Sequence, residues 1–159
     1  MEWIYEDGGR SKYFKTEHVG DCVTRAISIA TGIDYLEVYN EIQRRSKQET
    51  STQLKHHRGG KRSSARNGVF KETWKDYLKD LGWKKHSTCG FGKGVSCHLV
   101  EEELPMGTLI VQVSKHLVCV KDRVIYDTYN SSEKEYLDDE GNICINDRRA
   151  VYGYWIKEA

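Results

Sequence analysis

The chain has 159 residues, enough to bury a sizeable core, so we predict a single domain over residues 1–159. Its 25 basic and 24 acidic residues leave a net charge of +1, which excludes a global electrostatic preference for nucleic acid or an anionic membrane. No apolar run approaches the roughly 20 residues of a membrane-spanning helix, and five cysteines without regular spacing argue against a disulfide framework.

The N-terminal segment, residues 1–15, mixes aromatic and charged side chains around Gly8-Gly9. This pattern predicts a short strand or an arm packed on the domain. The segment lacks the basic region followed by an apolar region that marks a secretory signal peptide. Together with the irregular cysteines, this favours a cytoplasmic protein whose thiols stay reduced.

Residues 21–31 have the pattern of a helix that begins with a cysteine. Asp21 is a plausible N-cap, Cys22 lies in the first turn, and Gly32 suits the left-handed position after a helix. Unpaired backbone N–H groups and the positive end of the helix dipole favour a thiolate there, which is the nucleophilic form. The alternative is a structural role, because free cysteine is among the most buried residue types. The apolar stripe consists of Val23, Ala26, Ile27, Ile29 and Ala30.

Two more helices follow along the chain. Asp34 and Glu37 have the spacing of a capping box, which predicts a helix that ends near Arg45. A further helix is predicted over residues 70–81, where large apolar residues recur at helical spacing and Gly82 follows. This stripe, which we expect to be core, consists of Phe70, Trp74, Tyr77, Leu78 and Leu81.

Residues 46–68 differ in character from the helices on either side. Small hydroxylated residues alternate with basic ones and no hydrophobic periodicity is present, which predicts a long loop. One interpretation is a basic flap that contacts an acidic substrate, a phosphate or a partner through Lys61, Arg62 and Arg66. The other is a solvated insertion without a binding role.

The second half of the chain has the pattern of strands. Runs rich in β-branched residues predict strands at 108–113, 117–120, 124–126, 143–145 and 151–156. The acidic stretch 133–142 is predicted to be a turn region. Helices followed by an antiparallel sheet indicate an α+β fold.

The hairpin around Asp122-Arg123 brings a histidine near an acid. If the loop has two residues, His116 lies opposite Tyr129 and Asp127 is a diagonal neighbour, roughly 7–8 Å away at Cα. Asp127 would then fix one imidazole tautomer while the other ring nitrogen faces a thiol, the arrangement of a nucleophile, a base and an orienting group. A three-residue loop would shift the register by one and put Asp127 on the opposite face. The alternatives are a solvated histidine at a strand end and an aspartate that caps a turn at Thr128.

The order of these features resembles the papain-like cysteine peptidase superfamily, in which a thiol at a helix N-terminus meets a histidine from a following antiparallel sheet. The motifs that carry the resemblance are Asp21-Cys22-Val23-Thr24-Arg25-Ala26, Ile29-Ala30-Thr31-Gly32, Tyr77-Leu78, Gly82-Trp83, His116-Leu117-Val118 and Val124-Ile125-Tyr126-Asp127-Thr128. They are similar to small phage and bacterial members of the superfamily and cover about residues 13–156.

The resemblance implies Cys22 as nucleophile, His116 as general base and then acid, and Asp127 as the orienting group. It implies a cysteine hydrolase that cleaves a peptide, isopeptide or other amide bond without a cofactor, in the host cytoplasm if the chain is phage-encoded. The family's glutamine before the cysteine, an oxyanion-hole donor, is replaced by Thr16 here. The expected donors are therefore the backbone N–H of Cys22 and a second group from Thr16, His18 or a main-chain N–H.

Two alternatives remain open from the sequence. His86, Cys89, Cys97 and His98 match structural zinc in kind, but their spacing is poor, and we predict no metal site. A non-catalytic binding protein on the same fold would engage a host protein or nucleic acid through the basic residues 55–66 of the predicted loop. Activated labelling of Cys22 favours the hydrolase, and salt-sensitive nucleic-acid binding favours the binding protein.

Overall fold

The computed structural model describes residues 1–15, 19–57, 60–90 and 94–157, and these form a mixed α+β fold. Among them, the α-helices are α1 (Cys22–Thr31), α2 (Tyr35–Ser46), α3 (Ser51–His56) and α4 (Lys71–Asp80), with 3-10 turns η1 (Arg10–Lys12) and η3 (Glu101–Glu103). The main-sheet strands are β1 (Trp3–Tyr5), β2 (Trp83–Ser87), β5 (Thr108–Val113), β6 (His116–Lys121), β7 (Val124–Asp127) and β10 (Gly153–Lys157). The short hairpins are β3 (Cys89–Gly90) with β4 (Gly94–Val95), and β8 (Lys134–Leu137) with β9 (Ile143–Asn146).

The main sheet has the strand order β1-β7-β6-β5-β10-β2. Strands β7, β6, β5, β10 and β2 pair antiparallel, whereas β1 runs parallel to β7, so the sheet is mixed and the prediction of an antiparallel sheet was wrong at this edge. The N-terminal segment therefore does form a short strand, as predicted. It adds to the edge next to Asp127, where Tyr5 pairs with that residue.

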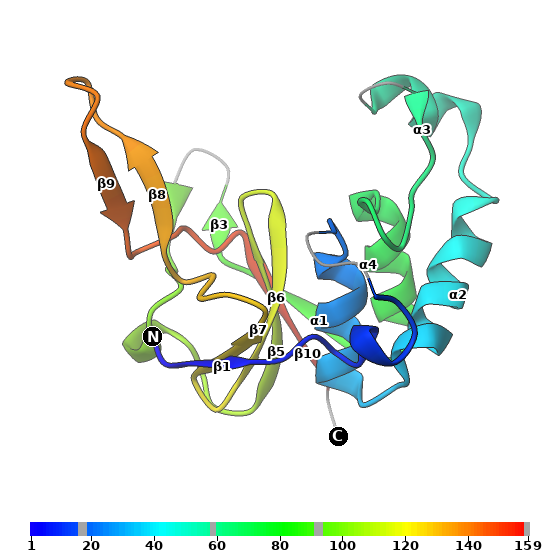
Figure 1. The fold of residues 1–159 in the computed structure, drawn as a ribbon, viewed down its shortest axis with the longest axis horizontal. Helices are drawn as coiled ribbons and strands as arrows, with labels where there is room; N and C mark the ends of the chain where they lie inside the picture. The colour runs from blue at the N-terminus through cyan, green and yellow to red at the C-terminus, as the bar shows by residue number, and fades with distance from the viewer. Residues whose placement is uncertain (16–18, 58–59, 91–93, 158–159) are drawn as a thin grey trace.

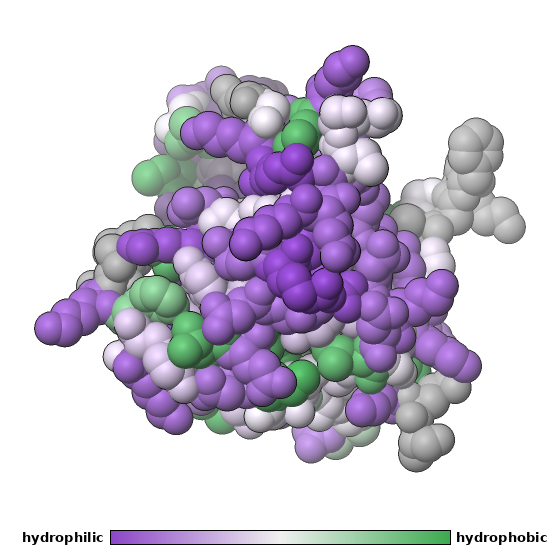
Figure 2. Space-filling model, turned by 90° about the vertical axis from the view of Figure 1, so that its right-hand side faces the viewer, coloured by the Kyte–Doolittle hydropathy of each residue, from purple (hydrophilic) through white to green (hydrophobic). Residues whose placement is uncertain are grey.

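The helices α1, α2 and α4 lie together beside the sheet (Figure 1). Both α1 and α4 contact the sheet, whereas α2 packs on these two helices. Val23, Ala26 and Ile27 of α1 enter one apolar core with residues of α2, α4 and the sheet. A second core, built from β5, β6, β7 and the segments around Leu99 and Val151, lies apart from it. Seen from the helical side, the surface is mainly hydrophilic, as expected for helices that bury one face (Figure 2).

The predicted helices are present, but their caps differ from the prediction. Asp21 and Asp34 occupy the N-cap positions of α1 and α2, yet neither side chain makes a capping hydrogen bond. The Asp34 carboxylate instead accepts a hydrogen bond from the Tyr13 hydroxyl at 2.7 Å. The proposed capping box at Asp34 and Glu37 was therefore wrong, because a tertiary partner takes the carboxylate.

The segment 46–68 is less irregular than predicted. It contains α3, whose capping box between Thr50 and Gln53 the sequence analysis missed. Buried Glu49 accepts hydrogen bonds from the Ser63 backbone N–H at 2.7 Å and the Thr73 hydroxyl at 2.5 Å. The buried carboxylate of Glu49 thus connects the end of this segment, at Ser63, to α4, at Thr73.

The predicted strand at 143–145 is present, but it does not join the main sheet as a closing strand, so the expectation of one antiparallel sheet was wrong here too. These residues belong to β9, which pairs with β8 in a separate hairpin that projects from the molecule (Figure 1). The supposed turn region 133–142 supplies β8, and the acidic residues 138–140 form the connection. Residues 143–146 pair with their near neighbours 134–137 along the chain, so they form a strand without joining the main sheet.

Candidate functional site

Cys22 is the first residue of α1, and its side chain is half-buried. The apolar side of α1 holds the helix against the sheet, because Val23, Ala26 and Ile27 share one core with Ile110 and Leu117. Backbone N–H groups in the first turn of a helix have no intrahelical acceptor, so the end of α1 that carries the sulfur favours negative charge. A thiol in this position is a candidate nucleophile.

His116 and Asp127 are brought together by the β6–β7 hairpin. Lys121 pairs with Val124 across a two-residue turn at Asp122-Arg123, both with positive φ, which confirms the predicted register. The Nε2 atom of His116 lies 2.7 Å from Oδ2 of Asp127. The two side chains are only 7% and 3% exposed, so water hardly competes for this bond.

Cys22 and His116 are also in contact, and each changes the other's acidity. Burial raises the pKa of the Cys22 thiol, but a hydrogen bond and positive charge from His116 and the backbone N–H of Leu117 outweigh it and lower that pKa. Burial lowers the pKa of His116, but hydrogen bonds to Asp127 and Cys22 raise it to about 9. Both shifts favour a thiolate–imidazolium pair at neutral pH.

The orientation of the imidazole follows from these contacts. Asp127 occupies Nε2, so Nδ1 is the ring nitrogen left for the thiol. Tyr129, which the hairpin register places opposite His116, brings its hydroxyl to 3.3 Å from Nδ1. The site thus contains a thiol, a base that contacts it, and a carboxylate that contacts and orients the base.

Asp127 is itself held by groups that are distant along the chain. Its Oδ1 atom accepts hydrogen bonds from Nη2 of Arg25 at 3.0 Å and from the Thr128 backbone N–H at 2.7 Å. Burial raises the pKa of Asp127, but the hydrogen bond and charge of His116 and the charge of Arg25 outweigh it, so that pKa is lowered. The carboxylate is therefore ionised and fixed in orientation.

Arg25 links this triad to a second buried carboxylate. Nη1 of Arg25 donates to Asp21, which lies one helical turn before it. Asp21 also accepts from Nη1 of Arg10 at 2.9 Å and from the Tyr35 hydroxyl at 2.6 Å. Asp21 is 1% exposed, so its charge requires these partners. This network explains why Asp21 does not act as a side-chain cap for α1.

The sulfur faces a pocket of about 190 Å³ between α1, α4 and the β5–β6 turn. The pocket is lined by Cys22, Val23, Gly68, Val69, Lys71, Trp74, Gln112, Val113, Lys115, His116 and Leu117. Gln112, which is 7% exposed, is the one polar uncharged side chain with an amide among the described lining residues. Among the residues that the structure describes, no aspartate or glutamate lines this pocket.

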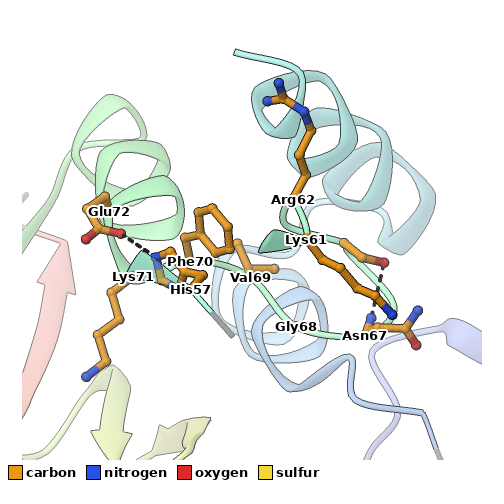
Figure 3. A pocket seen from close by; sticks show the side chains of 10 residues that line it. His57, Lys61, Arg62, Asn67, Gly68, Val69, Phe70, Lys71 and Glu72 are labelled. Carbon is orange, nitrogen blue, oxygen red and sulfur yellow. Dashed lines mark hydrogen bonds and ion pairs between the residues drawn. The ribbon is translucent and has the colours of Figure 1, made fainter. Parts of the chain in front are cut away.

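A larger groove of about 760 Å³ lies next to it and contains part of the predicted basic flap (Figure 3). Lys61 and Arg62 both line the groove, whereas Arg66 lines neither this groove nor the pocket at Cys22. The Arg62 Nη1 atom binds the carbonyl oxygens of Ser46 and Glu49 at 3.0 and 2.6 Å. Arg62 therefore has a structural role at the end of α2.

Other candidates from the sequence do not join the site. Thr16 and His18, the expected second oxyanion donors, lie outside the described residues. His86 stacks on Tyr154, and His98 lies 3.2 Å from Glu103. Within the described ranges, no group of three or more metal-ligating side chains is present.

Sequence reasoning missed the contact of Arg25 with Asp127. It also missed the positions of Gln112, Lys71 and Lys115 in the pocket. The helical spacing of Asp21 and Arg25 pointed to a pair, but not to a partner on a strand. Gln112 interrupts an otherwise apolar strand at 108–113, and a polar residue at such a position is a usable indication of a site.

Comparisons with known proteins leave the site to be interpreted from its own geometry. No protein-family model matches the chain, and no curated protein or solved structure matches it. Over the described ranges, none of the helices is both long and apolar enough to traverse a bilayer.

Proposed function

We propose that this protein is a cysteine hydrolase that cleaves a peptide, isopeptide or other amide bond through a thioester on Cys22. The observation that carries the proposal is the continuous arrangement of Cys22, His116 and Asp127, with a lowered thiol pKa and a raised imidazole pKa. The order of the three residues along the chain also resembles that of papain-like peptidases.

In the first half-reaction the Cys22 thiolate attacks the carbonyl carbon of the scissile amide. The imidazolium of His116 gives its proton to the leaving nitrogen, the C–N bond breaks, and a thioester remains. In the second half-reaction neutral His116 takes a proton from water, whose oxygen attacks the thioester and releases the acid and the thiol. Asp127 keeps Nδ1 directed at the sulfur throughout.

The tetrahedral intermediates require donors for a negatively charged oxygen. The backbone N–H of Cys22 belongs to the first turn of α1, where such groups lack an intrahelical partner. Gln112 lines the same pocket, and we assign its amide as the second donor in place of a glutamine before the cysteine. A reducing cytoplasm would keep the nucleophile as a free thiol.

Alkylation with iodoacetamide at pH 6 tests the proposal. Cys22 should be labelled before buried Cys97 and Cys119, since burial raises the pKa of both and that of Cys119 to about 12. The wild-type protein should also cleave a fluorogenic peptide-amide mixture, and Cys22→Ala should not. Equal, slow labelling of all cysteines would contradict the proposal and favour the non-catalytic binding protein.

A further inference from the structure

The charged side chains that line the pocket at Cys22 are all basic, which supports an inference about the substrate. Lys71, at the start of α4, and Lys115, in the β5–β6 turn, both line the pocket at Cys22. No carboxylate from the described ranges lines it with them. Because the whole chain is nearly neutral, with 25 basic and 24 acidic residues, this excess of positive charge is local.

The positive charge continues beyond the pocket. Gly68, Val69 and Lys71 line both the pocket at Cys22 and the larger groove, so the two hollows adjoin along this segment. Lys61 lines the far part of the groove, and its side chain and that of Lys71 extend to opposite sides (Figure 3). Within the described part of the chain, Lys61, Lys71 and Lys115 are exposed and none has a carboxylate partner.

Glu72 is the only acidic side chain among the described lining residues of the groove, and it lies beside a histidine. Glu72 lies 3.8 Å from Nε2 of His57, and the His57 ring stacks on Phe70 with centroids 3.5 Å apart (Figure 3). The floor of the groove thus combines an apolar surface with unpaired ammonium groups. An extended chain that lies across both hollows would present its side chains to Lys61, Lys71 and Lys115.

We infer that the cleft formed by the pocket at Cys22 and the adjoining groove accepts an acidic polypeptide segment, with carboxylates close to the scissile bond. This inference rests on the proposed function and names its substrate class. Lys71 and Lys115 would bind acidic side chains on the two sides of Cys22, and Lys61 one further along the chain. The apolar surface of Val69 and Trp74 would pack against the aliphatic parts of the same segment.

Two alkylating reagents of different charge test the cleft without a known substrate. Iodoacetate is an anion and iodoacetamide is neutral, and both require the thiolate, so the ratio of their rates at Cys22 does not depend on the thiol pKa. Reversing Lys71 and Lys115 together (Lys71→Glu, Lys115→Glu) should lower the iodoacetate-to-iodoacetamide ratio about tenfold at low ionic strength, and less in 0.5 M salt. The matched control Lys79→Glu, on the same helix but outside both hollows, should leave the ratio unchanged.

The two proposals fail in different ways in this experiment. If neither reagent labels Cys22 selectively, the hydrolase proposal is wrong. If iodoacetamide labels Cys22 selectively but the ratio is the same in the double variant and in wild type, only the acidic-substrate inference is overturned.

Protection from labelling identifies the class of polymer. Poly-L-glutamate should slow iodoacetamide labelling of Cys22 in the wild type, and more weakly in the double lysine variant, while poly-L-lysine should have no effect. A single-stranded oligodeoxynucleotide of similar charge should protect less well than poly-L-glutamate. Equal or better protection by the oligonucleotide, or no protection by either anion, overturns the assignment to an acidic polypeptide.

Discussion

Replacing Asp127 with asparagine tests the orientation of His116 most directly. In the wild type each carboxylate oxygen has its own partner: Oδ2 binds Nε2 of His116, and Oδ1 accepts from Arg25 and Thr128. An asparagine has only one acceptor oxygen. The Nη2 group of Arg25 and the Thr128 N–H can only donate, so the amide oxygen should face these two groups and the NH₂ group should face His116.

This orientation gives the imidazole the wrong tautomer. An NH₂ group donates to Nε2, which leaves the proton on Nδ1, the nitrogen that should accept from the Cys22 thiol. Asparagine fills the orienting position in some thiol enzymes, but here Arg25 should prevent it from doing so. We therefore expect Asp127→Asn to be as impaired as Asp127→Ala.

The size of the effect follows from the thiolate fraction. Without the imidazolium the Cys22 pKa should return to its ordinary range of about 8.5 or above, which leaves about 1% thiolate at pH 6.5. In the wild type the pKa of Cys22 is lowered and that of His116 raised to about 9, so the ion pair should dominate. The expected loss in labelling rate is about 100-fold, equivalent to about 2.7 kcal/mol.

The assay is iodoacetamide labelling of Cys22 between pH 5 and 9, followed by peptide mass spectrometry. Circular dichroism and continued protection of buried Cys119 would show that the variant is folded. Asp138→Asn, in the connection between β8 and β9, is the matched surface control. A folded Asp127→Asn protein that labels at the wild-type rate at pH 6.5 would refute the reasoning.

Four further outcomes follow from the same geometry. The pH profile of kcat/KM should be bell-shaped: activity appears as Cys22 ionises, below the usual thiol pKa, and falls as His116 loses its proton near the pKa of about 9. Gln112→Ala should lower kcat about 10²-fold while iodoacetamide still labels Cys22 at the wild-type rate, because alkylation forms no oxyanion. Arg25→Met should lower the free energy of unfolding by about 3–5 kcal/mol, measured in urea, because it removes one partner of buried carboxylates. Glu49→Ala should cost about 1–3 kcal/mol in the same assay, because it leaves buried donors without an acceptor.

Each of these outcomes has a result that contradicts it. A rate that keeps rising above pH 9 would mean that protonated His116 is not needed. If Gln112→Ala lowers kcat and the labelling rate equally, the substitution has impaired the reactivity of Cys22, and Gln112 is not shown to bind the oxyanion. Recovery of stability in Arg25→Lys is expected to be partial, since one ammonium group cannot hold two carboxylates, and full recovery would argue against the double contact. An unfolding midpoint unchanged by Glu49→Ala would mean that Ser63 and Thr73 find other acceptors.

Local patterns in the sequence were enough to predict the helices and the hairpin. The spacing of apolar residues predicted α1, α2 and α4 within one or two residues of their ends, because helical periodicity depends on neighbours along the chain. The two-residue turn at Asp122-Arg123 set the β6–β7 register and placed His116 beside Asp127. A register is a local property of a hairpin, so this part of the candidate site was predictable.

Tertiary structure decided where the charged side chains found partners. Arg25 and Asp127 are 102 residues apart, and no local pattern selects that pair over another. Asp21 and Asp34 have the sequence of helix caps, yet distant partners bind their carboxylates because buried or ordered charges are stabilised by the nearest complementary group in space. Likewise, Gln112, Lys71 and Lys115 come from separate elements and line one pocket only because α1 and α4 pack beside the sheet.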